Sequence, residues 1–134
     1  MAIEWTEDLA TGVNKIDNQH KELFKRINNM LEACNQGKGK NEVERVIKFL
    51  EDYVIIHFSE EEKYMTTFDY PEYSTHKGQH SQFIENFSGL KRKFETEGVG
   101  LHIVILTNHL VVDWFINHIR KLDKALGGFL KAKI

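Results

Sequence analysis

The sequence is poor in cysteine and proline and has no long apolar run. Cys34 is the only cysteine and Pro71 the only proline among 134 residues. An internal disulfide is therefore impossible, which fits a reducing compartment, and Cys34 is expected to be a small buried side chain. The longest apolar stretch, LVVDWFI, is interrupted by Asp113 and is too short to cross a bilayer. The N-terminus lacks a basic region followed by an apolar run. These absences predict a cytoplasmic protein without membrane insertion.

An excess of charge of one sign is also lacking. The chain carries 18 lysines and arginines against 20 aspartates and glutamates, a formal net charge of −2. This balance gives no indication of a nucleic-acid partner or of binding to a charged surface. A length of 134 residues with 41% hydrophobic residues suits a single domain, 1–134, with one buried core.

Glycine is concentrated where long amphipathic segments end, as in helices joined by short connections. Four helices are predicted. The first begins after the N-cap Asp17 and ends at about Asn35, and the second begins after Asn41 and ends at about Met65. The third runs from Pro71 to Gly98, and the fourth from about Leu101 to about Leu126. Helices of similar length with short loops become antiparallel neighbours. The predicted fold is all-α: an up-down-up-down four-helix bundle over about 17–126, with a non-helical N-terminal arm over about 1–16.

The segment THKGQH raises the question of function, because it places His76 and His80 four residues apart. Residues four apart share one face of a helix. The apolar positions of this helix run 73, 76, 80, 83, 87, 90 and 94, so both histidines fall in the buried stripe. A single pair at this spacing is more often structural than a metal site.

The other three predicted helices also interrupt their apolar stripes with polar residues. His57 and Glu61 lie one turn apart on the second helix, and His20 lies on the apolar face of the first. His118 lies on the apolar face of the fourth. Asp123 follows it by five residues, about 140° further round an α-helix, so it would reach the same point from the flank.

Five inward histidines and two inward carboxylates are more than a purely structural bundle has reason to bury. Zinc prefers four ligands in a tetrahedron. Seven ligands, of which two carboxylates can each bridge, suit two six-coordinate first-row metal ions with one position left vacant. The helical period places His102 and His109 away from the apolar stripe. It also places Glu60 and Glu62 on the solvated face. Asp17 is predicted to be a helix cap.

Nearly the whole chain resembles the hemerythrin family, and in particular its single-domain bacterial members. The matching stretches are Trp5, Gly12, IDNQHKELF at 16–24, HFSEEE at 57–62, YPEYSTHKGQH at 70–80 and WFINHIRKLD at 114–123. The resemblance implies a non-haem di-iron centre in which His76, His80 and His118 bind one iron and His20 and His57 bind the other. It also implies that Glu61 and Asp123 bridge the irons together with an oxo or hydroxo group, and that dioxygen binds at the open position of the two-histidine iron.

One position departs from the family pattern. The residue three before the fourth-helix histidine is commonly leucine in the family and lies against the oxygen pocket, whereas here it is Phe115, preceded by Trp114. Pocket size and the rate of oxygen release are therefore the properties expected to differ.

The chemistry of the predicted ligands favours a carrier over an oxidising enzyme. Two ferrous ions, two carboxylates and one hydroxide leave a net charge near +1, and no Glu-x-x-His motif of the carboxylate-rich di-iron enzymes occurs in the sequence. The function expected first is a dioxygen carrier, store or donor, with an oxygen-consuming enzyme as a possible recipient. The alternatives are an oxygen or redox sensor, a di-iron peroxidase or nitric-oxide scavenger with at most weak activity, and a metal-free bundle.

Overall fold

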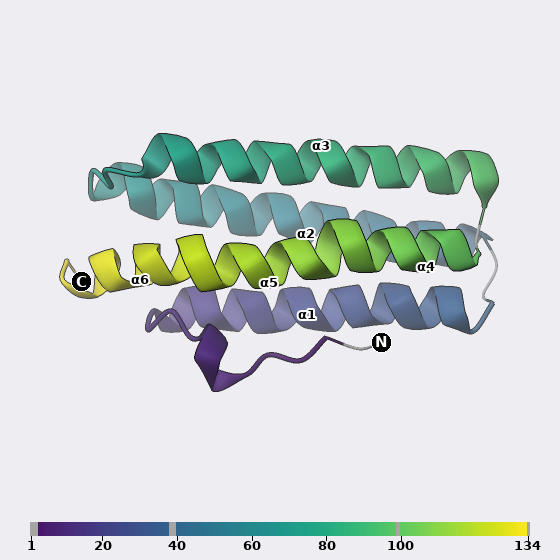
Figure 1. Ribbon diagram of the computed structural model, residues 1–134, viewed down its shortest axis with the longest axis horizontal. Helices are drawn as coiled ribbons and strands as arrows, with labels where there is room; N and C mark the ends of the chain where they lie inside the picture. Colours follow the sequence, from purple (N-terminus) through teal and green to yellow (C-terminus); the bar gives the residue numbers. More distant parts are fainter. Residues whose placement is uncertain (1–2, 38–39, 99, 134) are drawn as a thin grey trace.

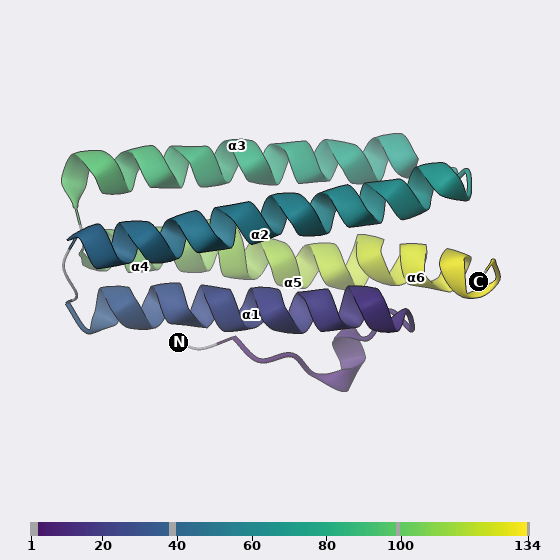
Figure 2. The ribbon, with the colours of Figure 1, turned by 180° about the vertical axis from the view of Figure 1, so that it is seen from behind.

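The protein is a bundle of four long antiparallel rods, which confirms the predicted fold (Figure 1). A computed structural model describes residues 3–37, 40–98 and 100–133. The first three rods are α1 (Asn14–Asn35), α2 (Lys40–Thr67) and α3 (Tyr73–Glu97). The fourth is one continuous helical segment composed of α4 (Leu101–Thr107), η2 (Asn108–Asp113), α5 (Trp114–His118), η3 (Ile119–Asp123) and α6 (Lys124–Lys131). The rod α1 packs against α2 and α4, and α3 packs against α2 and the α4–η2 segment, so each rod has two neighbours (Figure 2).

Several predicted helix ends are wrong. Helix α1 begins at Asn14, so Asp17 is not its N-cap, and α2 begins at Lys40, so Asn41 lies inside the helix. Pro71 belongs to the turn before α3, while Gly98 ends that helix with a positive φ of 78°, as expected for glycine. The fourth rod continues past Leu126 to Lys131.

Asp17 has a structural role that its predicted cap position does not explain. Its side chain is buried, and its Oδ1 accepts hydrogen bonds from both the backbone N–H and the hydroxyl of Thr11, each at 2.8 Å. Thr11 in turn lies against Gly127 of α6, where a Cβ would collide with the Thr11 carbonyl. The arm is thus fixed between the first turn of α1 and the last helix.

The arm is shorter than predicted and contains one 3₁₀ turn, η1 (Glu7–Leu9). Its beginning runs along α1 in Figure 1, where Asn28 forms two hydrogen bonds of 2.8 Å with the backbone of Ile3. Within η1, the backbone carbonyl of Asp8 accepts a hydrogen bond from Lys124, and its carboxylate accepts one from Arg120. The arm therefore contacts both sides of the turn that carries Asp123.

The core consists of two apolar clusters separated by a polar layer. On α1, Ile16 belongs to the smaller cluster and Leu23 to the larger one, and His20 lies between them. The same order recurs along α2, where Glu61 lies between Phe58 and Met65. No helix among the described residues is long and apolar enough to span a bilayer. The polar layer is the feature that the fold positions.

Candidate metal centre

All seven side chains predicted as ligands meet in this polar layer. Each is at most 2% exposed, although the seven come from four rods. His20 comes from α1, His57 and Glu61 from α2, His76 and His80 from α3, His118 from α5, and Asp123 from η3.

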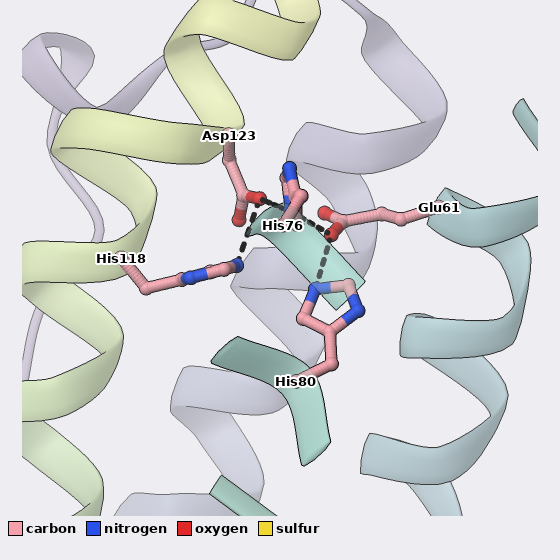
Figure 3. A group of neighbouring side chains, drawn as sticks. All are labelled: Glu61, His76, His80, His118 and Asp123. Atoms are coloured by element: carbon pink, nitrogen blue, oxygen red, sulfur yellow. Dashed lines mark ion pairs between the residues drawn. The ribbon is translucent and has the colours of Figure 1, made fainter. Parts of the chain in front are cut away.

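The seven form two groups that share both carboxylates. Glu61, Asp123 and three histidines (His76, His80, His118) make one group, and the same carboxylates with His20 and His57 make the other; within each group the ligand atoms lie within 4.8 Å of one another. We call these the three-histidine side and the two-histidine side. Figure 3 shows the three-histidine side, with the Glu61 and Asp123 carboxylates entering from opposite helices.

Each carboxylate directs one oxygen to each side. Glu61 Oε1 lies 3.1 Å from His80 Nε2, and its Oε2 lies 3.1 Å from His57 Nε2. Asp123 Oδ1 lies 3.1 Å from His118 Nε2, and its Oδ2 lies 2.9 Å from His20 Nε2. This is the arrangement that two bridging carboxylates require.

The atoms facing the centre have no hydrogen-bond partner. Among the described residues, this holds for all five inward histidine Nε2 atoms and for both oxygens of Glu61 and of Asp123. Buried polar atoms left without a partner cost free energy, so such a cluster calls for something that satisfies them. Nine convergent nitrogen and oxygen donors are a set that fits first-row metal ions such as iron.

Asp123 reaches the centre through a π-helical turn. It follows His118 by five positions, and in a regular α-helix the two side chains would point about 140° apart. The segment η3 between them is π-helical, with hydrogen bonds to the fifth rather than the fourth residue. The wider turn takes up the extra residue, so the prediction that Asp123 approaches from the flank is wrong: it lies in line with His118.

Three histidines are oriented from outside by residues next to other ligands. The Nδ1–H of His57 donates to Gln19 Oε1 at 2.8 Å, and that of His118 donates to Gln79 Oε1 at 3.0 Å. The Nδ1–H of His80 donates to Glu62 Oε2 at 3.0 Å. Each bond fixes the tautomer that leaves the Nε2 lone pair facing the centre.

The assignment of Glu62 to the solvated face is therefore wrong, and the roles of the two glutamines were missed. Gln19 precedes His20, Gln79 precedes His80, and Glu62 follows Glu61. A residue next to an inward ligand points about 100° away, toward the adjoining helix. Adjacency to a ligand was the available indication in the sequence.

Charge in the metal-free centre is balanced by two imidazolium rings. Burial lowers the pKa of His20, but the neighbouring Asp123 and Glu61 outweigh it and raise the pKa to about 10. The same balance raises the pKa of His76 to about 9. Burial raises the pKa of the Asp123 carboxyl, yet the surrounding imidazoles lower it well below its usual range, and the pKa of Glu61 moves in the same direction. Both carboxylates are thus ionised at neutral pH.

The two remaining histidines lie away from the centre, as predicted. The His109 side chain is 77% exposed, with Asp113 at 4.0 Å, and that of His102 is 38% exposed, with Glu97 at 3.7 Å. Neither belongs to a group of potential ligands among the described residues.

The chain matches the family model described as the hemerythrin HHE cation binding domain over residues 11–130. The chain belongs to the hemerythrin family. It is 32% identical to the bacteriohemerythrin of Methylococcus capsulatus over 129 residues, which cover 96% of each chain. It is 38% identical to the bacteriohemerythrin of Pseudomonas paraeruginosa over 120 residues, covering 89% of this chain and 75% of that one. A solved wild-type hemerythrin superposes with a TM-score of 0.84 at 30% identity, covering 96% of this chain and 97% of the other.

In this hemerythrin chain, an aromatic wall adjoins the three-histidine side. Phe58 stacks on His80 with ring centroids 3.9 Å apart and planes 5° apart, and Trp114 stacks on His118 at 4.4 Å and 12°. Phe115 is fully buried and contacts Phe58, Phe83 and Trp114. The aromatic ring contacts of Phe115 thus go to α2, to α3 and to its own rod. Whether Phe115 and Trp114 line an oxygen pocket stays a prediction.

Proposed function

We propose that this hemerythrin chain binds dioxygen reversibly at a non-haem di-iron centre and acts as an oxygen carrier, store or donor. In this proposal His76, His80 and His118 hold one iron, and His20 and His57 hold the other. Glu61 and Asp123 bridge the two, together with an oxo or hydroxo group. An oxygen-consuming enzyme is the proposed recipient.

The convergence of nine unpaired donor atoms from four rods is the observation that carries the proposal. Five Nε2 atoms and four carboxylate oxygens face one buried space, and both carboxylates are shared between the two sides. A single ion cannot accept all of them. The family membership and the bacteriohemerythrin relatives support iron as the metal and dioxygen as the ligand.

The protein's own contribution is to hold the metal ions, to orient the histidine rings and to exclude water from the centre. When bound, two irons supply the two electrons that reversible dioxygen binding uses. The hydrogen bonds to Gln19, Gln79 and Glu62 set ring orientation, and the stacked rings of Phe58 and Trp114 keep the His80 and His118 planes in place. The apolar surroundings exclude water, which limits irreversible oxidation.

The ligand composition supports a carrier rather than an enzyme. Two carboxylates and five histidines carry little negative charge, whereas the carboxylate-rich di-iron sites of other four-helix bundles use Glu-x-x-His motifs. Turnover with peroxide in the steady state would contradict this part of the proposal.

An absorption spectrum combined with metal analysis tests the function. After reconstitution with ferrous iron under anaerobic conditions, we expect two irons per chain. We also expect near-ultraviolet bands of oxo-bridged ferric iron in air, and a spectrum that reverses when oxygen is removed promptly. One zinc per chain, or no metal, would rule out the proposal.

A matched pair of histidine variants tests the ligand set. His118→Ala should lose iron, because its Nε2 faces the centre, whereas His109→Ala should retain two irons, because its side chain is 77% exposed on the same rod. His118→Ala should also lower the melting temperature less in the metal-free protein than in the loaded one. Equal losses in both states would make His118 an ordinary core residue.

A further inference from the structure

Glu62 differs from the other two residues that orient a histidine at the centre. Gln19 and Gln79 offer neutral amide oxygens to His57 and His118, whereas Glu62 offers a carboxylate oxygen to His80 at 3.0 Å. Hydrogen bonds to an ionised acceptor are about twice as strong as neutral ones. The only charged acceptor among these three bonds therefore lies on the three-histidine side.

The His80 ring is held between consecutive glutamates. Its Nδ1 contacts Glu62, and its Nε2 lies 3.1 Å from Glu61 Oε1. Glu61 is fully buried and Glu62 is 24% exposed, because neighbouring residues on a helix point about 100° apart. Phe58 stacked on the ring prevents it from rotating out of this position.

The charge of Glu62 is only weakly compensated by its surroundings. Among the described residues, Glu62 Oε1 pairs with Lys77 Nζ at 3.9 Å, and the Lys77 side chain is 50% exposed and therefore solvated. By contrast, the neighbouring Glu60 pairs with Lys15 at 3.1 Å. Of the two contacts of the Glu62 carboxylate, the one to His80 is thus the shorter and the more buried.

We propose that Glu62 is a positioning residue that makes His80 the most electron-donating histidine of the centre and thereby favours the more oxidised metal on the three-histidine side. A carboxylate on the outer nitrogen of a metal-binding histidine raises the basicity of the inner nitrogen. The two-histidine side has only Gln19 in this position, and the outer nitrogens of His20 and His76 have no partner among the described residues. This inference rests on the proposed function for the identity of the metal.

Glu62→Gln is the decisive variant, because it keeps the shape and an acceptor oxygen while removing the charge. We expect zinc affinity, measured with the metal alone, to fall about tenfold or more, within the range seen when such outer partners are changed. We expect the reduction potential of the iron-loaded protein to rise; a tenfold loss of preference for the oxidised metal corresponds to about 59 mV for a one-electron couple. The ¹⁵N shift of His80 Nδ1 in the zinc-loaded protein should move toward that of a neutral-partner histidine.

Two further variants separate charge from fold. Glu60→Gln removes an identical charge two residues away, without a contact to His80, and should leave zinc affinity and potential near those of the unmodified protein. Gln79→Glu adds a carboxylate on His118 and should lower the potential. A purely structural role would give Glu62→Gln a lower melting temperature without a change in potential or in the ¹⁵N shift.

Equal potentials and zinc affinities for Glu62→Gln and Glu60→Gln would overturn the inference while leaving the di-iron proposal intact. Failure of the unmodified protein to take up two irons would instead overturn the proposed function. In that case the zinc affinities and the ¹⁵N shift still decide the role of Glu62.

Discussion

Phe115 is the residue expected from the sequence to replace a leucine common in the hemerythrin family, and it is fully buried. Its ring packs on Phe83 at 4.9 Å and on Trp114 at 5.2 Å, within the larger apolar cluster. Truncating a phenylalanine in such a place costs about 3–5 kcal/mol and leaves a cavity the size of a ring. Polar groups nearby would let water enter that cavity.

We expect Phe115→Ala to retain two irons but to speed both oxygen release and autoxidation, because water and protons then reach the centre. Stopped-flow release and the decay of the oxygenated spectrum measure the two rates separately. Phe49→Ala is the matched control, since Phe49 is 54% exposed on α2 and should leave both rates unchanged. Autoxidation that is unchanged or slower in Phe115→Ala would show that this ring does not guard the centre.

At the scale of the element, the fourth rod is unusual because two π-helical segments interrupt it. The segment η3 contains the extra residue that places Asp123 in line with His118, and Lys121 within it is exposed. A π-helical turn is equivalent to an α-helix with one inserted residue. Removing that residue therefore restores a regular helix without changing the phase of the residues on either side.

We expect deletion of Lys121 to leave two metals per chain, because His118 and Asp123 would then stand four apart in a regular helix and still share a face. Deletion of Gly78, an exposed residue between His76 and His80, should abolish metal binding, since α3 has no π turn to absorb the change. Metal analysis and circular dichroism check both variants. Loss of metal in the Lys121 deletion would mean that the π turn itself is required.

The same contrast explains which parts of the centre the sequence could predict. His57 and Glu61, like His76 and His80, stand four apart in uninterrupted α-helices, so the 3.6-residue period placed them correctly. The phase of Asp123 could not be predicted, because nothing in the residue pattern marks a π turn. The predicted positions of the helix ends were wrong for a different reason. Tertiary contacts, such as those between Thr11 and Asp17, outweighed the local capping preference.

At the scale of the whole molecule, the stability of the metal-free protein depends on pH through the protonation of the centre. His20 and His76 have pKa values of about 10 and about 9, above the ordinary value of 6.5. A raised pKa contributes stability that is fully present below pH 6.5 and is lost as the pH rises through 9 to 10. Glu61 and Asp123 have lowered pKa values, so their contribution is present above their ordinary values and is lost in acid.

We expect metal loading at pH 7 to release at least two protons per chain, one each from His20 and His76. Each imidazolium must lose its Nε2 proton before that nitrogen can bind a metal. The difference in melting temperature between loaded and metal-free protein should widen from pH 6.5 to pH 10, as only the metal-free form loses its imidazolium rings. The buffer dependence of the binding heat gives the proton count, and thermal unfolding at several pH values gives the difference. Release of no protons at pH 7 would show that both rings are neutral before loading.

The distribution of the ligands over residues 20 to 123 has a consequence for biosynthesis. A ribosome makes the chain from its N-terminus, so His20, His57 and Glu61 emerge well before His118 and Asp123. Until the last rod has docked, only five of the seven candidate ligands are in place, and both groups lack Asp123. A complete ligand set for the proposed centre therefore exists only after translation has passed Asp123, and we expect metal loading to follow that step.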